Sequence, residues 1–267
     1  MREPFGTRLR AAIDKRGPLC VGIDPHPALL DAWGVGDSPA GLERFCLTVA
    51  EAAADLAAVV KPQSAFFERW GSRGVAVLER LLAELREAGT LVVLDVKRGD
   101  IGSTMAGYTE AYLDHDSPLA CDAITVSPYL GFGSLRGAVA AAYAADAGLF
   151  VLARTSNPEA AELQDLVAGQ VFDGVGAANA GREPLGSIGV VVGATLSSAG
   201  YPLERLNGPV LAPGLGAQGA SAADVARLFW PVRQAVLPSV SRAVLEDPAK
   251  VRERVMTFRD ECAEALA

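Results

Sequence analysis

The chain lacks the features that mark disulfide-rich, zinc-binding and membrane proteins. Its 267 residues include four cysteines, which are far apart and form no CxxC pair, so neither a zinc site nor a disulfide framework is indicated. The most apolar region, residues 138–153, is interrupted by Asp146 and Gly148 and is shorter than the roughly 20 apolar residues that span a bilayer. Residues 1–17 contain no apolar core of a signal peptide. We therefore expect a cytoplasmic protein in a reducing compartment, with no membrane partner.

Common catalytic signatures are also missing: the GxSxG elbow, the HExxH helix and the GxxxxGK[ST] loop do not occur. Nor does the chain have an excess of positive charge. Its formal net charge is −8, from 24 Lys and Arg against 32 Asp and Glu, so the overall field repels nucleic acid. We expect no nucleic-acid partner, and an anionic ligand requires a local cluster of Lys and Arg.

Short β-branched apolar runs that suit buried strands alternate with helical patterns along the chain. The runs cover residues 19–24, 56–62, 91–97, 123–128, 149–156, 188–195, 209–213 and 235–241. Helix signals lie between them, including Ser38 before Pro39, a helical pattern that ends at Gly89, and Ser221 before an apolar periodic stretch. Residues 1–17 indicate a further, short amphipathic helix.

These eight β-then-α units predict an α/β fold, a single (β/α)8 TIM barrel that forms one domain over residues 1–267. No linker, composition break or close internal repeat divides the chain. An open doubly wound sheet is the alternative, because periodicity alone does not distinguish the two. In a barrel, the active site lies at the C-terminal ends of the strands.

Polar side chains stand at most of these predicted strand ends. They are Asp24, Lys61, Asp95, Lys97, Arg154, Thr155, Ser156, Ser241 and Arg242. A single charged residue at such a position is compatible with a solvated strand end. Several acidic and basic groups at one rim indicate a site, because half-buried ions need partners.

The third predicted strand carries the densest charge pattern, VLDVKRGDIGSTM. Asp95 and Lys97 are two residues apart and therefore point to the same face of a strand, while Asp100 follows in the turn. Carboxylates on both sides of Lys97 favour its ammonium form, and Lys61 could extend the alternation of charge from the neighbouring strand. The alternative is an exposed turn with loosely paired charges, worth about 0 to 1 kcal/mol each.

The stretch LAPGLGAQGAS places Gly214, Gly216 and Gly219 in GxGxxG spacing, after a predicted strand and before a helix. This spacing resembles a dinucleotide fingerprint, but it lies at the seventh strand and lacks the strand-end acid expected about 20 residues later. In a barrel, the same loop and the end of strand eight form a phosphate site from backbone amides and Arg242. A glycine-rich turn without a ligand is the alternative.

The two histidines are weaker candidates for chemistry. His26 lies in a proline-rich loop, and His115, between Asp114 and Asp116, is most simply an exposed helix end. The carboxylates could hold a metal ion, but the interleaved lysines repel a divalent cation. We therefore expect no metal.

The stretch LDVKRGDIGST closely resembles the D-x-K-x-x-D-I-x-x-T signature of orotidine 5′-monophosphate decarboxylases, which make UMP in pyrimidine biosynthesis. Together with VGIDPHP, VVKPQSAFFE, TSNP, APGLGAQG and SR, it is similar to the longer bacterial, type 2 branch of that family over residues 19–242. The resemblance implies a barrel enzyme without cofactor or metal. It also implies a homodimer with its two sites at the subunit interface.

The resemblance also implies roles for the charged residues of strands two and three. By this resemblance, Lys97 donates the proton to C6 of the pyrimidine, and Asp95 is the carboxylate near the leaving group. Lys61 completes the charge network and touches the ribose. Asp100 enters the site of the partner subunit, and Thr104 reaches across the dimer with it. A fixed ammonium at Lys97 suits the reaction, because the electron density left at C6 must be stabilised and then protonated.

The remaining implied residues bind the substrate. Asp24 accepts from a ribose hydroxyl, Ser156 contacts the pyrimidine amide edge, and Gln218 bridges phosphate and base. Arg242 grips the phosphate. Many relatives have glycine before this arginine, where this chain has Ser241, which still supplies a backbone amide.

Two other functions are compatible with part of the pattern. A sugar-phosphate lyase or epimerase of a related phosphate-binding barrel family can carry D-x-K-x-x-D, but it uses Mg²⁺ on its carboxylates. A barrel that senses UMP without catalysis is the second alternative, although a binder has no need of a proton donor such as Lys97. Activity that survives EDTA separates the first alternative from the decarboxylase.

Overall fold

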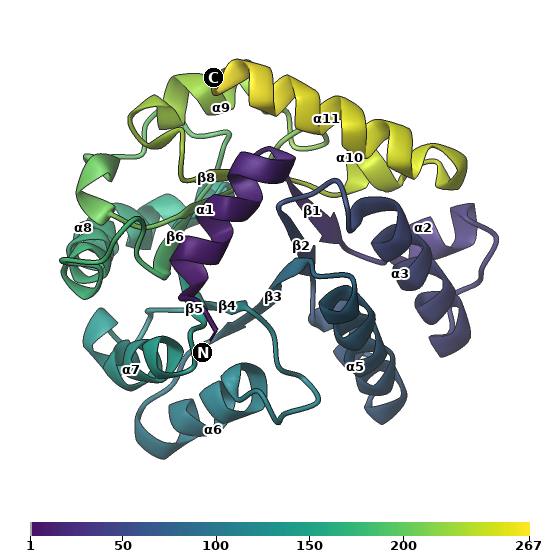
Figure 1. Cartoon of the computed structure of the whole chain (residues 1–267), viewed down its shortest axis with the longest axis horizontal. Coiled ribbons are helices and arrows are strands. Elements are labelled where there is room, and N and C mark those ends of the chain that lie inside the picture. Colours follow the sequence, from purple (N-terminus) through teal and green to yellow (C-terminus); the bar gives the residue numbers. More distant parts are fainter. Residues whose placement is uncertain (1) are drawn as a thin grey trace.

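A computed structural model describes residues 2–267, and its strands close into an eight-stranded parallel barrel surrounded by helices (Figure 1). The strands are β1 (Cys20–Ile23), β2 (Val59–Pro62), β3 (Leu91–Arg98), β4 (Ala123–Val126), β5 (Gly148–Arg154), β6 (Ile188–Val192), β7 (Val210–Pro213) and β8 (Val236–Val240). Each pairs with its neighbours in sequence, and β8 pairs with β1 to close the barrel. The predicted TIM barrel is confirmed, and the open-sheet alternative is wrong.

The helix α1 precedes β1, and the other helices follow strands around the outside of the barrel. They are α1 (Phe5–Arg16), α2 (Pro27–Ala32), α3 (Pro39–Ala53), α4 (Ala65–Glu68), α5 (Ser72–Glu87), α6 (Gly102–Leu113), α7 (Arg136–Ala144), α8 (Ala161–Ala178), α9 (Ala222–Phe229), α10 (Arg242–Leu245) and α11 (Val251–Ala265). Short 3-10 turns are η1 (Phe132–Leu135), η2 (Pro158–Ala160), η3 (Leu203–Leu206), η4 (Trp230–Val232) and η5 (Pro248–Lys250). Within residues 2–267, none of the helices combines the length and apolar character needed to span a membrane.

The predicted helix boundaries are explained by capping. Ser38 accepts a hydrogen bond from the backbone N–H of Gly41 at the start of α3. Ser221 and Asp224 form a capping box at the start of α9. Gly89, just beyond α5, has a φ of +67°, the left-handed conformation that glycine adopts without steric cost at the end of a helix.

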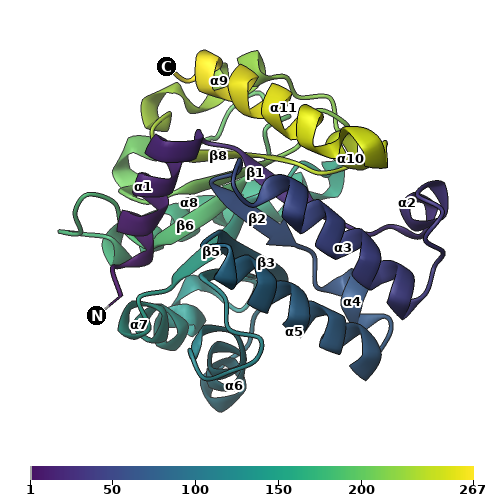
Figure 2. The same ribbon diagram turned by 45° about the vertical axis from the view of Figure 1, so that its right-hand side comes forward.

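The apolar side chains of the strands fill two separate cores. Outward-pointing residues pack against the surrounding helices, among which α3 and α5 lie side by side in Figure 2. Inward-pointing residues form one apolar layer inside the barrel: Cys20, Val59, Val93, Ala123, Phe150, Val191, Leu211 and Leu237. The predicted N-terminal helix is α1, which lies across the barrel in Figure 1 and covers this layer with Phe5, Leu9 and Ile13.

The position of the polar residues follows from this layer. Side chains alternate along a strand, so the residue two positions after each layer residue also points into the barrel. On six of the strands these residues are Lys61, Asp95, Thr125, Leu152, Pro213 and Ser239, and all six line a pocket. A layer that contains Lys61, Asp95, Thr125 and Ser239, which we call the polar layer, therefore lies next to the apolar one, at the C-terminal ends of the strands.

Candidate active site

The pocket at the C-terminal mouth of the barrel has a volume of about 510 Å³ and receives residues from every strand or from the loop that follows it. Seven of the nine residues predicted from the sequence line it: Asp24, Lys61, Asp95, Lys97, Ser156, Gln218 and Arg242. The remaining two, Asp100 and Thr104, do not. The sequence therefore located the mouth and most of its polar lining.

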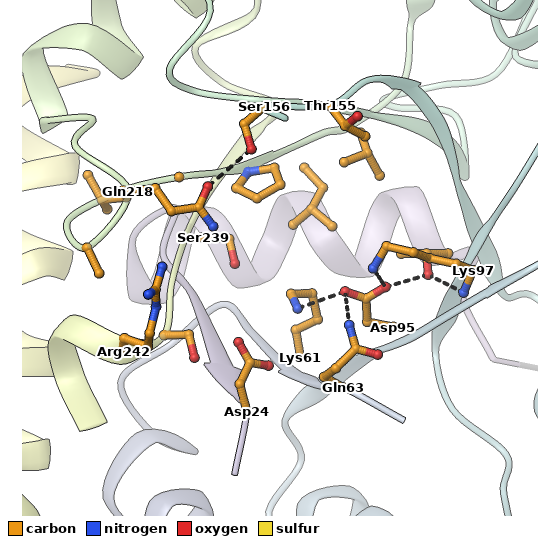
Figure 3. A pocket seen from close by; sticks show the side chains of 18 of the residues that line it. Asp24, Lys61, Gln63, Asp95, Lys97, Thr155, Ser156, Gln218, Ser239 and Arg242 are labelled. Carbon is orange, nitrogen blue, oxygen red and sulfur yellow. Dashed lines mark hydrogen bonds and ion pairs between the residues drawn. The ribbon is translucent and has the colours of Figure 1, made fainter. Parts of the chain in front are cut away.

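Asp95 lies at the centre of a hydrogen-bonded charge network (Figure 3). Its Oδ2 accepts from Lys61 Nζ at 3.1 Å and from Gln63 Nε2 at 3.0 Å. Its Oδ1 accepts from Lys97 Nζ at 2.6 Å and from Thr125 Oγ1 at 2.8 Å. Both carboxylate oxygens thus have two donors each, and two of the four donors are ammonium groups.

The pKa values of the buried pair reflect this arrangement. Burial alone would raise the pKa of Asp95, but Lys61 and Lys97 outweigh it and hold that pKa far below its usual range. Burial alone would lower the pKa of Lys61, but the charges of Asp95 and Asp24 outweigh it and raise that pKa. Asp95 and Lys61 are therefore both charged at neutral pH.

The two lysines differ in their access to the pocket. The Lys61 side chain is 8% exposed, whereas that of Lys97 is 47% exposed. The backbone of Lys97 has a φ of +46°, and the β3–β4 register shifts between Leu94 and Arg98. This left-handed conformation is uncommon for a residue other than glycine, and it indicates that the surrounding structure constrains the backbone at Lys97. Lys61 is fixed in the wall, while Lys97 reaches into the open space.

The opposite side of the pocket is built by the loop after β7 and by the end of β8. In Figure 3, Arg242 lies across the pocket from Lys97. Gly214 and Gly216 have φ values of +121° and +75°, and a Cβ on Gly216 would lie 2.9 Å from that of Ala243. The glycines therefore let the β7 loop lie against the residues next to Arg242. Because the loop belongs to a closed barrel and leads from β7 into α9, the dinucleotide-sheet interpretation is excluded.

Further polar groups lie in the pocket between the Lys97 side and the Arg242 side, and some of them have no hydrogen-bond partner within residues 2–267. Ser156 Oγ donates to Gln218 Oε1 at 3.1 Å, which joins the β5 and β7 loops across the mouth. Asp24 Oδ1 and Ser241 Oγ are buried side-chain atoms without a hydrogen-bond partner in the described part of the chain. Buried acceptors are normally satisfied, so an unpartnered carboxylate oxygen in a pocket indicates a ligand donor.

Asp100 and Thr104 lie outside the pocket of their own chain. Asp100 Oδ1 accepts from the backbone N–H of Ile101, at the turn that leads into α6. Thr104, in the first turn of α6, is exposed, and Ile101, next to Asp100, is 61% exposed. Their role in a neighbouring site stays a prediction.

Thr155 and Ser241, two of the predicted polar strand ends, also line the pocket. Four other polar residues line it that the sequence does not mark as site residues: Gln63, Thr125, Ser239 and His26. The first three lie at inward-pointing positions of the alternation along β2, β4 and β8, so the period of two that marks Lys61 and Asp95 also predicts these neutral side chains. His26 packs edge-on against Phe66, with ring centroids 4.4 Å apart.

Arg154 and His115 have other surroundings. Arg154 forms an ion pair with Asp165 of α8 and donates to the carbonyl of Ser198 at 3.4 Å. Its side chain therefore does not line the pocket. His115 is exposed beyond the end of α6, as predicted. Among residues 2–267, no group of three or more His, Cys, Asp or Glu side chains is placed to hold a metal ion.

Comparison with known proteins identifies the family. Residues 17–255 match the model of the orotidine 5′-phosphate decarboxylase / HUMPS family. The chain is 61% identical over 250 residues to the orotidine 5′-phosphate decarboxylase of Streptomyces coelicolor, covering 91% of this chain and 90% of that one. It is 57% identical over 274 residues to the enzyme of that name from Salinispora arenicola, covering 99% of each chain.

Solved structures agree with this match. A crystal structure of a Streptomyces avermitilis protein superposes with a TM-score of 0.96 at 57% identity, covering 99% of this chain and 96% of that one. The structure of Leishmania donovani OMP decarboxylase superposes with a TM-score of 0.79 at 29% identity, covering 98% and 99%. The chain belongs to the orotidine 5′-phosphate decarboxylase / HUMPS family.

Proposed function

We propose that the chain decarboxylates orotidine 5′-monophosphate to UMP and CO₂ in pyrimidine biosynthesis, without a cofactor, and that Lys97 protonates C6. The observation that carries this proposal is the Lys61–Asp95–Lys97 array at the barrel mouth, where the exposed ammonium of Lys97 lies 2.6 Å from a fixed carboxylate oxygen. The match to decarboxylases over nearly the whole chain supports it.

The chemistry explains why such an array is needed. When the bond between C6 and the carboxylate carbon breaks, CO₂ leaves and the electron pair remains on C6. A preorganised positive charge beside C6 stabilises this carbanion, because it needs no reorganisation during the reaction. The Lys97 ammonium supplies that charge and then transfers its proton to C6. Lys97 regains a proton from solvent, through the open side of the pocket.

Asp95 and Lys61 prepare Lys97 for this role. Asp95 accepts from the Lys97 ammonium and so holds it in one position, while the buried Lys61 balances the charge of Asp95 from the wall. In the proposed complex, Asp95 also lies near the substrate carboxylate, whose negative charge disappears as CO₂ leaves. The lowered pKa of Asp95 keeps it ionised beside the leaving group.

The rest of the pocket binds the nucleotide. Arg242 and the backbone of the β7 loop take the phosphate, at the far side of the pocket from Lys97 (Figure 3). Ser156 contacts the amide edge of the pyrimidine, and Gln218 bridges phosphate and base. Asp24 accepts from a ribose hydroxyl, which gives its unpartnered Oδ1 a donor. Phosphate binding far from C6 supplies binding energy that orders the site for the reaction.

We further propose that the enzyme works as a homodimer with shared sites. Asp100 and Thr104 lie outside their own pocket, on the turn and first helical turn after β3. In the dimer they enter the partner's site, where Asp100 joins the Lys97 array. A twofold axis then produces two identical composite sites.

The whole of residues 1–267 acts as one domain in this proposal, because α1 completes the core inside the barrel. A cytoplasmic location agrees with its cysteines, which are free and buried.

One assay tests the proposed activity. Purified protein is mixed with orotidine 5′-monophosphate in EDTA without added metal, and the absorbance of the orotidine ring is followed. A decrease with release of CO₂ is expected. Activity that requires Mg²⁺ would favour the lyase or epimerase alternative, which is disfavoured by the ammonium groups on both oxygens of Asp95. UMP binding without any turnover would favour a sensor.

A further inference from the structure

We infer that Thr125, on β4, is a positioning residue that sets both the backbone of Lys97 and the carboxylate of Asp95. This inference rests on the proposed function, in which those two groups act on the substrate. Thr125 itself is 1% exposed. It therefore acts through its neighbours.

The hydroxyl of Thr125 makes all three hydrogen bonds of which a hydroxyl group is capable. It accepts from the backbone N–H of Val96 at 3.0 Å and from that of Lys97 at 2.9 Å. It also lies 2.8 Å from Asp95 Oδ1. A hydroxyl has one proton and two acceptor lone pairs, so two incoming N–H groups leave its proton for Asp95. Oδ1 is then an acceptor, and Oδ2 also accepts, from Lys61 and Gln63. Neither oxygen carries a proton, so the carboxylate is in the ionised form that the decarboxylation requires.

The same hydroxyl explains the unusual backbone at Lys97. Between Leu94 and Arg98 the β3–β4 register shifts, and there two consecutive N–H groups of β3 bind this one side chain of β4. An irregular backbone persists only where its buried polar groups are satisfied. Thr125 is thus the acceptor that permits the φ of +46° at Lys97 and turns its ammonium toward Asp95.

Removal of this hydroxyl at constant side-chain shape tests the inference. In Thr125→Val, two N–H groups lose their acceptor and Asp95 loses a donor, so Lys97 leaves its reactive position. We expect kcat to decrease about 10²-fold, the size of effect that follows a displacement of about 1 Å of a reacting group. Thr125→Ser keeps the hydroxyl and should retain most of the wild-type kcat.

Thr90→Val is the matched control. Thr90 lies just before β3, is 3% exposed, and donates to the carbonyl of Ala54 at 2.8 Å. This variant also loses a buried threonine hydroxyl, but at the other end of β3. It should lose stability and keep wild-type kcat. Binding-competent sites are counted by UMP titration in every variant, because a merely structural defect reduces the number of sites and leaves kcat per site unchanged.

Crystal structures of Thr125→Val and Thr125→Ser with UMP provide a second readout, which is independent of turnover. We expect Lys97 to leave the left-handed region in the valine variant and to keep it in the serine variant. If Thr125→Val does not fold, Thr125→Ala, which removes the same hydroxyl without adding a methyl group, is measured in its place. Wild-type kcat per site in the hydroxyl-free variant, an equal loss in Thr125→Ser, or an unchanged Lys97 backbone would overturn the inference. A wild-type protein without decarboxylase activity would instead refute the proposed function. The backbone conformation of Lys97 in the crystal structures of the variants would still test whether Thr125 positions it.

Discussion

The two ends of the barrel use buried charge in opposite ways. At the N-terminal end, Asp122 is 8% exposed and pairs with both Arg2 and Arg8, and its Oδ2 accepts from the backbone N–H of Val92 at 2.8 Å. The helix α1 lies over this end and seals it with apolar side chains. The buried carboxylate of Asp122 is therefore neutralised by arginines of the N-terminal segment.

At the C-terminal mouth, by comparison, several charged and polar groups have no partner, or only one, among the residues that the structure describes. Asp95 is balanced by two lysines, yet Lys97 remains half exposed, and buried acceptors of Asp24 and Ser241 have no partner within residues 2–267. Arg242 is exposed and, within the described chain, forms no ion pair or side-chain hydrogen bond. One barrel thus separates the two tasks: the closed end stabilises the fold, and the open end keeps groups free for a ligand.

Among the substitutions that test this comparison of the two ends, Lys97→Ala should have the largest effect on kcat. The substitution removes the proton donor and the charge that stabilises the carbanion, so kcat should fall by many orders of magnitude while the fold and UMP binding persist. The measurement is kcat for orotidine 5′-monophosphate together with the affinity for UMP. Lys15→Ala, at an exposed lysine in the last turn of α1, is the control from the closed end and should keep wild-type kcat. More than a tenth of wild-type turnover in Lys97→Ala would refute the assignment of Lys97.

Mixed dimers test whether the open mouth is completed by a second chain. Homodimers of Lys97→Ala and of Asp100→Ala should both be inactive, because every site lacks one group. After subunit exchange, a mixed dimer has one doubly damaged site and one intact site. With equal amounts and random exchange, half of the dimers are mixed and half of their sites are intact, so activity should recover to roughly one quarter of wild type.

Exchange is verified by mass spectrometry of the intact dimer. A mixture that exchanges subunits and stays as inactive as its parents would mean that Asp100 serves its own chain. The open mouth would then be complete within one barrel.

Arg242→Ala tests the phosphate side of the mouth and should have a smaller effect. It removes a charge-assisted contact worth about 1.5 to 3 kcal/mol, so phosphate-bearing ligands should bind about 10- to 150-fold more weakly. The nucleoside orotidine should bind almost as it does to the wild type. Arg154→Ala is the control, because Arg154 pairs with Asp165 and lies outside the pocket lining. An equal loss for nucleotide and nucleoside would assign Arg242 another role.

Most of the fold was predictable because its signals are local. The strand runs are rich in β-branched and apolar residues, as expected for strands covered on both faces, and Ser38 and Ser221 mark helix starts through their own hydrogen bonds. The position of α1 was not predictable. Its amphipathic pattern predicts a helix, but only the tertiary structure places Phe5 against Phe150 inside the barrel.

The site was predictable where residues carry charge. Lys61, Asp95 and Lys97 are conspicuous at strand ends, because buried ions are rare and need partners. Thr125 and Gln63 are neutral, and their importance arises from hydrogen bonds to Asp95 that join separate strands. No local pattern encodes those distances. Asp100 does not line the pocket of its own chain, and its place in a partner's site stays a prediction.

Phe5→Ala probes the closed end and should have the smallest effect on catalysis. Phe5 is fully buried, and its ring meets that of Phe150 edge-on at a centroid distance of 6.0 Å. Its removal leaves a cavity under the barrel and should lower the free energy of unfolding by about 3 to 5 kcal/mol. The apolar layer separates this cavity from the polar layer of Lys61 and Asp95, so kcat per UMP-binding site should remain at the wild-type value well below the melting temperature. Denaturant unfolding and kcat are measured on the same preparation. A kcat that falls together with stability would show that the two ends are mechanically coupled, and the separation of tasks between them would be wrong.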